Sequence, residues 1–130
     1  MNRILALSIM LTMVAAQCLA ADTTWMPDTA TIQKLEVAVT KDDGAHGGPF
    51  HQHADGIDSY ARYYAGTIEG GHHIVRGFLS RSDLGVGKGI HIVSNIGQFP
   101  MIADGGCNYA DVSYNADSDQ LNYIRCHGVG

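Results

Sequence analysis

Residues 60–80 of this 130-residue chain read YARYYAGTIEGGHHIVRGFLS. The two ends of this segment, residues 60–68 and 73–80, are rich in the aromatic and β-branched side chains that strands favour. Between them stand Gly70 and Gly71, a pair that fits a tight turn. The segment therefore predicts a β-hairpin whose side chains alternate between two faces.

The tyrosines of the first predicted strand divide between those two faces. Tyr60 and Tyr64 would share one face with Arg62, whereas Tyr63 would point to the other. Tyrosine is common at protein interfaces, so the cluster is a candidate contact surface. A role in the core is favoured, because so small a domain has few other large apolar residues; Arg62 would then extend to water at the sheet edge.

Two more parts of the chain extend the predicted sheet. Ile90, Ile92 and Ile96 would share one face of a third strand. Residues 108–114 and 121–125 predict a second hairpin, because a short run of Asn, Asp and Ser separates two segments typical of strands.

The segment before the first hairpin has two interpretations. Asp28 or Thr29 would cap a short helix that runs to Val39 and places Ile32 and Leu35 on the same face. Apolar residues also alternate over the last part of this segment, as in a strand, and periodicity alone leaves both open. A short N-terminal helix packed on an antiparallel β-meander of about four to five strands, in the α+β class, is the simplest fold.

Length and composition limit the chain to a single small globular domain over residues 21–130. Within it, residues 41–56 are rich in glycine, aspartate and histidine and predict a flexible loop. A formal net charge of −5 argues against nucleic-acid binding, which needs an excess of basic residues.

Residues 1–20 have the pattern of a secretory signal peptide. Arg3 supplies a positive start, and residues 4–16 are uncharged and mostly apolar. Cys18 and Ala20 place small residues at positions −3 and −1 of a cut after Ala20. We therefore expect a periplasmic or secreted protein.

Two other interpretations of this segment are weaker. An apolar run of 13 residues is shorter than the roughly 20 that a membrane-spanning helix needs, and we expect no membrane span in the mature chain. Acylation at Cys18 is disfavoured because the bulky Gln17 precedes it.

The mature chain then holds two cysteines, Cys107 and Cys126. In an oxidising compartment such a pair predicts a disulfide bond. If the two cysteines face each other across the second hairpin, Ala110 lies opposite Tyr123.

The sequence contains no motif for nucleophilic catalysis. It has no Gly-x-Ser-x-Gly segment and no Cys-x-x-Cys pair. A small hydrolase remains an alternative only if histidine and aspartate residues distant in sequence assemble its site. The leading hypothesis is a non-catalytic, disulfide-stapled protein of the cell envelope or exterior that binds another envelope or extracellular protein.

A metal-binding envelope protein is the main alternative. His46, His51, His53 and Asp55 lie within ten residues of one another, and imidazole and carboxylate suit Zn²⁺ or Cu²⁺. The same segment resembles the His-x-His-x-Asp-His signature of binuclear metallohydrolases, but Gly56 replaces the last histidine and the chain is too short for those enzymes. Apart from such an ion, we expect no cofactor.

Four short motifs carry a resemblance to a known group. They are Leu35-Glu36, YARYYA at residues 60–65, DGGC at residues 104–107 and CHG at residues 126–128. Together they resemble a group of small exported bacterial proteins of uncharacterised function. The resemblance implies export and a shared architecture, but no activity. Residues 46–53 are outside the pattern, so a site there would be particular to this chain.

Overall fold

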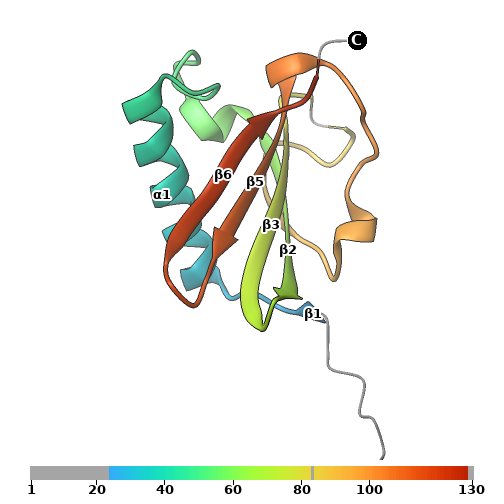
Figure 1. Cartoon of the computed structure of the whole chain (residues 1–130). Helices are drawn as coiled ribbons and strands as arrows, with labels where there is room; N and C mark the ends of the chain where they lie inside the picture. The colour runs from blue at the N-terminus through green and yellow to red at the C-terminus, as the bar shows by residue number, and fades with distance from the viewer. Residues whose placement is uncertain (1–23, 83, 129–130) are drawn as a thin grey trace, which may run out of the picture.

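The computed structural model describes residues 24–82 and 84–128 (Figure 1). Within these residues, one α-helix and six strands form the fold: α1 (Thr29–His46), β1 (Thr24–Trp25), β2 (Ala61–Glu69), β3 (His72–Ser80), β4 (Gly89–Ile92), β5 (Tyr109–Asn115) and β6 (Gln120–Cys126). The predicted signal peptide, residues 1–20, lies outside the described residues. Within the described residues, no helix is long and apolar enough to cross a membrane.

The strands form a single sheet in the order β1-β2-β3-β5-β6, and each neighbouring pair on this path is antiparallel. α1 lies against one face of the sheet, while residues 93–104 pass along the other side (Figure 1). The α+β prediction of one helix packed on an antiparallel sheet is confirmed.

The third predicted strand does not pair with the strand before it, as it would in a simple meander. It is reduced to the four residues of β4, which pair in parallel with β2. β3 already has β2 and β5 as neighbours, so the chain that follows β3 pairs instead with the free edge of β2. β1 occupies the other end of the same edge, opposite Gly66 and Thr67, which limits the length of β4.

Helix α1 resolves the ambiguity of the N-terminal segment. The Asp28 carboxylate accepts a hydrogen bond of 2.8 Å from the backbone N–H of Thr31, and this bond lowers the pKa of Asp28. Ile32, Leu35 and Val39 are buried against the sheet, as the helical periodicity predicts.

The helix is longer than predicted, and the boundary of the expected loop over residues 41–56 was therefore wrong. Residues 41–46 are helical, and Gly47 ends the helix in the left-handed conformation (φ 68°). Asp43 explains the difference, because its carboxylate is buried and accepts the backbone N–H groups of Phe50 (2.9 Å) and His51 (2.6 Å). Asp43 lies in the segment for which the composition predicted a loop, but its side chain instead holds the following turn against the helix.

The main core lies between α1 and the sheet. Its fully buried side chains come from the helix, from the segment between the helix and β2, and from three strands: Ile32, Leu35, Val39, Phe50, Tyr60, Tyr64, Val75, Leu79, Val112 and Tyr114. The predicted core role of the tyrosines is confirmed. Gly77 has to be a glycine, because a Cβ there would lie 2.5 Å from Val112 and 2.7 Å from Tyr64.

Arg62 lies inside this core rather than at the sheet edge, so the prediction for this residue was wrong. Only 5% of it is exposed, and its Nε lies 2.6 Å from Glu36 Oε1 on α1. Its Nη1 lies 3.3 Å from Asp58 and also donates to the carbonyl of Ile57. Tyr64 donates its hydroxyl to the same Glu36 oxygen (3.0 Å), so this carboxylate accepts hydrogen bonds from both Arg62 and Tyr64.

The disulfide between Cys107 and Cys126 is confirmed. The predicted hairpin register was wrong, because Ala110 pairs with Cys126 and Ser113 pairs with Tyr123. Cys107 lies in a 3₁₀ turn that precedes β5, so the cross-link joins the end of β6 to this turn and not to a facing strand residue.

We expect Glu36→Gln to lower the free energy of unfolding by about 2 kcal/mol, because it weakens a charge-assisted hydrogen bond and leaves the buried Arg62 short of one anionic partner. Lys34→Gln is the control: it removes an exposed ion pair of the same helix, 3.2 Å from Asp119, and should change little. Urea denaturation of both variants measures the difference, and equal effects would contradict the role given to Arg62.

We expect the double variant Cys107→Ser/Cys126→Ser to lose about 3 kcal/mol of stability and to melt roughly 10 °C lower, since a bond across 19 residues restricts the unfolded chain. Differential scanning calorimetry measures the shift. A reductant should bring the wild type to the melting temperature of the variant and leave the variant unchanged. If the wild type kept its melting temperature after the disulfide had been fully reduced, the prediction would be wrong.

Candidate functional site

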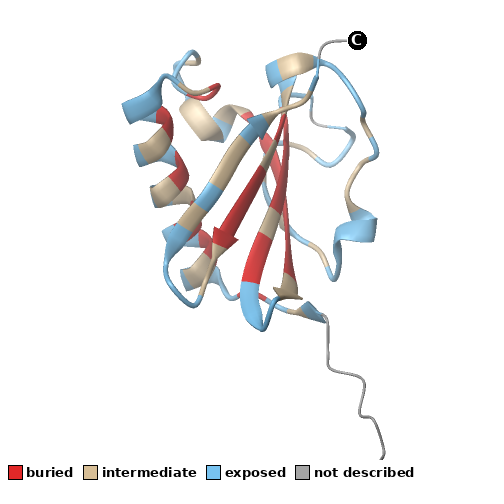
Figure 2. Ribbon diagram, viewed as in Figure 1, coloured by how far each residue is buried: buried red, intermediate tan, exposed pale blue. Residues whose placement is uncertain are grey.

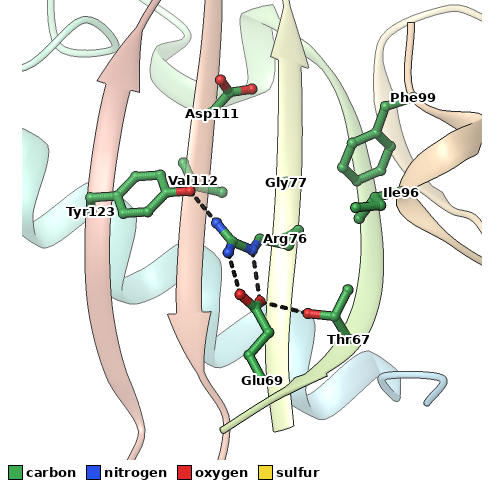
Figure 3. Close-up of a pocket in the computed structure, with 9 residues that line it drawn as sticks. All are labelled: Thr67, Glu69, Arg76, Gly77, Ile96, Phe99, Asp111, Val112 and Tyr123. Atoms are coloured by element: carbon green, nitrogen blue, oxygen red, sulfur yellow. Dashed lines mark hydrogen bonds and ion pairs between the residues drawn. The ribbon is translucent and has the colours of Figure 1, made fainter. Parts of the chain in front are cut away.

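The sheet face turned away from α1 is only partly covered. Val93, Phe99 and Ile102 pack over Tyr63 and Phe78 at one end of this face. The remainder forms a cavity of about 390 Å³, called here the sheet cavity (Figure 3). Its lining comes from four strands and from the covering segment: Thr67, Glu69, Arg76, Gly77, Ile96, Phe99, Asp111, Val112 and Tyr123.

A network of hydrogen bonds forms the polar floor of the sheet cavity (Figure 3). Arg76 of β3 makes a two-point ion pair with Glu69 of β2, with its Nε 2.8 Å from Oε2. Thr67 donates its hydroxyl to the same carboxylate (2.7 Å), and Arg76 also donates to the hydroxyl of Tyr123 on β6. The side chains of three strands are thereby held in fixed positions.

The charges of this network hold each other in the ionised state. The hydrogen bond from Arg76 lowers the pKa of Glu69; partial burial opposes the shift, and the bond from Thr67 adds to it. The same bond raises the pKa of Arg76. Within this network, the negative charge of Glu69 is therefore balanced by the positive charge of Arg76.

The opposite wall of the sheet cavity is apolar. Ile96 and Phe99 project from the covering segment toward the sheet, and Ile96 is 51% exposed. Tyr123 presents an aromatic ring on the floor, and the guanidinium of Arg125 stacks on that ring at 4.5 Å. The cavity thus places an apolar wall against a floor of aromatic and charged groups.

Asp111 connects the sheet cavity to a histidine that sequence reasoning did not single out. Its Oδ2 lies 3.1 Å from Nε2 of His127, whose side chain is 11% exposed and packs between the rings of Phe78 and Tyr109. The two atoms are at ion-pair distance, but neither ring nitrogen of His127 forms a hydrogen bond within the described residues.

This pair is the kind of arrangement that the hydrolase alternative requires, since Asp111 and His127 are distant in sequence. It lacks a neighbouring thiol nucleophile, because the adjacent Cys126 is bonded to Cys107. No spacing rule in the sequence brings these residues together; the pairing of β5 with β6 does so.

The histidines of the predicted metal site turn toward different carboxylates. His46, the last residue of α1, has its Nδ1 3.1 Å from an oxygen of Asp42. His51 contacts the carbonyl of Gly48 through Nδ1, which lies 3.8 Å from Asp43. Each of the two imidazoles thus has a local partner in the turn at the end of the helix.

The other two members of that predicted site are no closer to forming a cluster. His53 packs beside the ring of Tyr60 at 6.1 Å, and the backbone carbonyl of Asp55 accepts the N–H of Asp58 in a 3₁₀ turn. Among residues 24–82 and 84–128, no group of three or more His, Cys, Asp or Glu side chains is arranged to hold a metal ion. Zinc or copper binding at this loop stays a prediction.

Comparisons with known proteins give no family for this chain: no family model, no curated protein and no solved structure matches it. Inference about function therefore depends on the chemistry of the surface itself.

We expect Arg76→Met to raise the pKa of Glu69 toward its ordinary value of 4.5, because the largest cause of its lowered pKa is the bond to Arg76. The ion pair stabilises the fold above the unfolded-state pKa of Glu69, and this contribution is lost as the pH falls through the lower folded-state value. Carboxyl NMR titration measures the shift. Tyr123→Phe, which keeps the ion pair, is the control, and an unchanged Glu69 pKa in Arg76→Met would contradict the prediction.

Proposed function

We propose that this chain is a non-catalytic binding protein of the periplasm or the cell exterior, and that it contacts another envelope or extracellular protein through the sheet cavity. The observation that carries the proposal is the sheet cavity itself, where a fixed polar floor faces an apolar wall on the face that α1 leaves open.

The residue types at this surface suit a protein partner. Tyrosine, arginine and phenylalanine are enriched at the centres of protein interfaces, where a few such side chains supply most of the binding energy. Tyr123, Arg76 and Phe99 lie together in the cavity. An apolar side chain of the partner would fit between Phe99 and Tyr123. Backbone N–H groups of the partner could donate to the Glu69 carboxylate.

The fixed network favours binding because its side chains lose little conformational entropy on association. Glu69, Arg76 and Tyr123 are already held by one another. A partner therefore does not need to immobilise these long side chains, which would otherwise cost about 0.5–1.5 kcal/mol each.

Two features support a location outside the cytoplasm. The Cys107–Cys126 disulfide is typical of proteins that fold in oxidising compartments. Residues 1–20 carry the sequence pattern of a signal peptide. The net charge of −5 gives no general attraction to nucleic acid, so a protein partner is preferred.

Native mass spectrometry of the protein isolated from its own host tests the proposal, because it reports a bound partner and a bound metal together. Once the partner is identified, we expect Ile96→Asp to weaken its affinity at least tenfold. Ile96 is exposed at the wall of the sheet cavity, and the change places an unpaired charge where an apolar contact is expected.

Val37→Asp is the matched control, because Val37 is a 69% exposed β-branched residue on α1, on the other side of the sheet. Calorimetric affinities should stay within about twofold for this variant. Loss of affinity in Val37→Asp but not in Ile96→Asp would move the binding surface to the helix. A metal ion without a protein partner would favour the metal-binding alternative.

A further inference from the structure

A second hollow lies beside the sheet cavity, where residues 99–104 cross the open face of the sheet. Its volume is about 360 Å³, near the lower end of the roughly 300–1,000 Å³ usual for small-ligand pockets. The covering residues 99–104 are exposed or half-buried throughout (Figure 2). Asp111 and His127 supply its polar side chains, and we call it the Asp111 hollow. The rest of its lining is apolar: Phe78, Phe99, Pro100, Met101, Ile102 and Ala103.

The carboxylate of Asp111 is shared by this hollow and the sheet cavity. The side chain is 43% exposed, and it points away from the Glu69–Arg76 pair (Figure 3). Within the described part of the chain, Asp111 forms no ion pair with a lysine or an arginine. Arg125 lies across from it in the β5–β6 pairing, but its guanidinium stacks on Tyr123. The carboxylate therefore faces the hollow without a bound positive charge.

His127 adds an unsatisfied polar group beside the same carboxylate. Its side chain is 11% exposed, and both ring nitrogens are buried without a hydrogen-bond partner among the described residues. Such groups are costly, and in native proteins they are often explained by the function of a site. Nε2 of His127 lies 3.1 Å from Oδ2 of Asp111, so Oδ1 is the carboxylate oxygen that is left for a ligand.

We propose that the Asp111 hollow binds an alkylammonium group, with the ammonium donating to Oδ1 of Asp111 and the apolar stem packed against Phe99 and Ile102. The unpaired carboxylate and the net charge of −5 both attract a cation. A metal ion fits poorly, because the described residues hold no group of three ligating side chains. A compact ammonium suits one free oxygen, whereas the planar guanidinium fork pairs best with both oxygens of a carboxylate.

The ammonium group has two sources that the structure allows. A free amine can enter from solvent, because Met101 and Ala103 are exposed at the hollow. A lysine of a protein partner can also reach it, because Phe99 and Asp111 line both the hollow and the sheet cavity. With a lysine, the inference rests on the proposed function and names one residue type of the partner.

Titration of the isotope-labelled exported protein with phenethylamine, followed by backbone amide NMR at pH 7.5, tests the proposal. At this pH alkylamines are charged, and an ordinary histidine is mostly neutral. We expect saturable shifts at Ile102, Asp111 and His127. We expect 2-phenylethanol, which has the same stem without the charge, to bind at least tenfold more weakly. Asp111→Asn should weaken amine binding at least tenfold, because it removes the anionic acceptor.

Asp42→Asn is the matched control. The Asp42 side chain is 44% exposed and lies 3.1 Å from a histidine, His46, so its surroundings resemble those of Asp111. Asp42 is on α1, however, and lines neither the sheet cavity nor the Asp111 hollow. This variant should bind phenethylamine within about twofold of the wild type.

Ala103→Lys keeps the test decisive if Asp111→Asn does not fold. Ala103 is exposed at the hollow, so the new ammonium group can pair with Asp111 within the chain and should weaken amine binding at least tenfold. Shifts that do not saturate, equal binding of 2-phenylethanol, or unchanged amine binding in Asp111→Asn and Ala103→Lys would overturn the proposal.

The affinity of the protein partner, once it is identified, distinguishes the two sources. If Asp111→Asn weakens binding of both the amine and the partner, the ammonium belongs to a lysine of the partner. If it weakens binding of the amine alone, the ligand is a free amine. Ile96 lines the sheet cavity but not the Asp111 hollow. Amine binding that persists while Ile96→Asp leaves partner affinity unchanged would therefore contradict the proposed function and support the ammonium site.

Discussion

The ion pair between Arg62 of β2 and Glu36 of α1 fixes how the helix lies on the sheet. Arg62 is only 5% exposed, so its charge needs partners within the protein, and Glu36, Asp58 and the carbonyl of Ile57 provide them. These partners come from the helix and from the turn before β2. The helix cannot slide or rotate along the sheet without leaving a buried charge unpaired, so the apolar core around it has a single register.

The two faces of the sheet differ in composition and in what covers them. Apolar side chains and tyrosines fill the face under α1, whereas the other face carries the network of Glu69, Arg76 and Tyr123 beneath the wall formed by residues 93–104. The period-2 alternation of strands produces this division, because successive residues of β2 and β3 serve the core and the sheet cavity in turn. A binding surface on such a sheet is held rigid by the packed core on the other face.

The edges of the sheet differ as much as its faces. The β6 edge carries polar and charged residues, and the disulfide holds the end of that strand to the turn before β5. The β4 edge is short, uncharged and apolar. The sheet cavity and the β4 edge thus lie on separate parts of the same sheet.

The sequence alone determined the features that depend on local pattern: the hairpin of residues 60–80 and the paired cysteines. Short-range periodicity and residue type are enough for these. For residues 29–40 it left helix and strand both open, and the structure decided for the helix. Only the tertiary structure decided the position of β4, the partners of Arg62, the cap that Asp43 gives to the following turn and the meeting of Asp111 with His127. Each of these joins residues on different elements or across a turn, and their energy depends on burial and charge in three dimensions, which no spacing along the chain encodes.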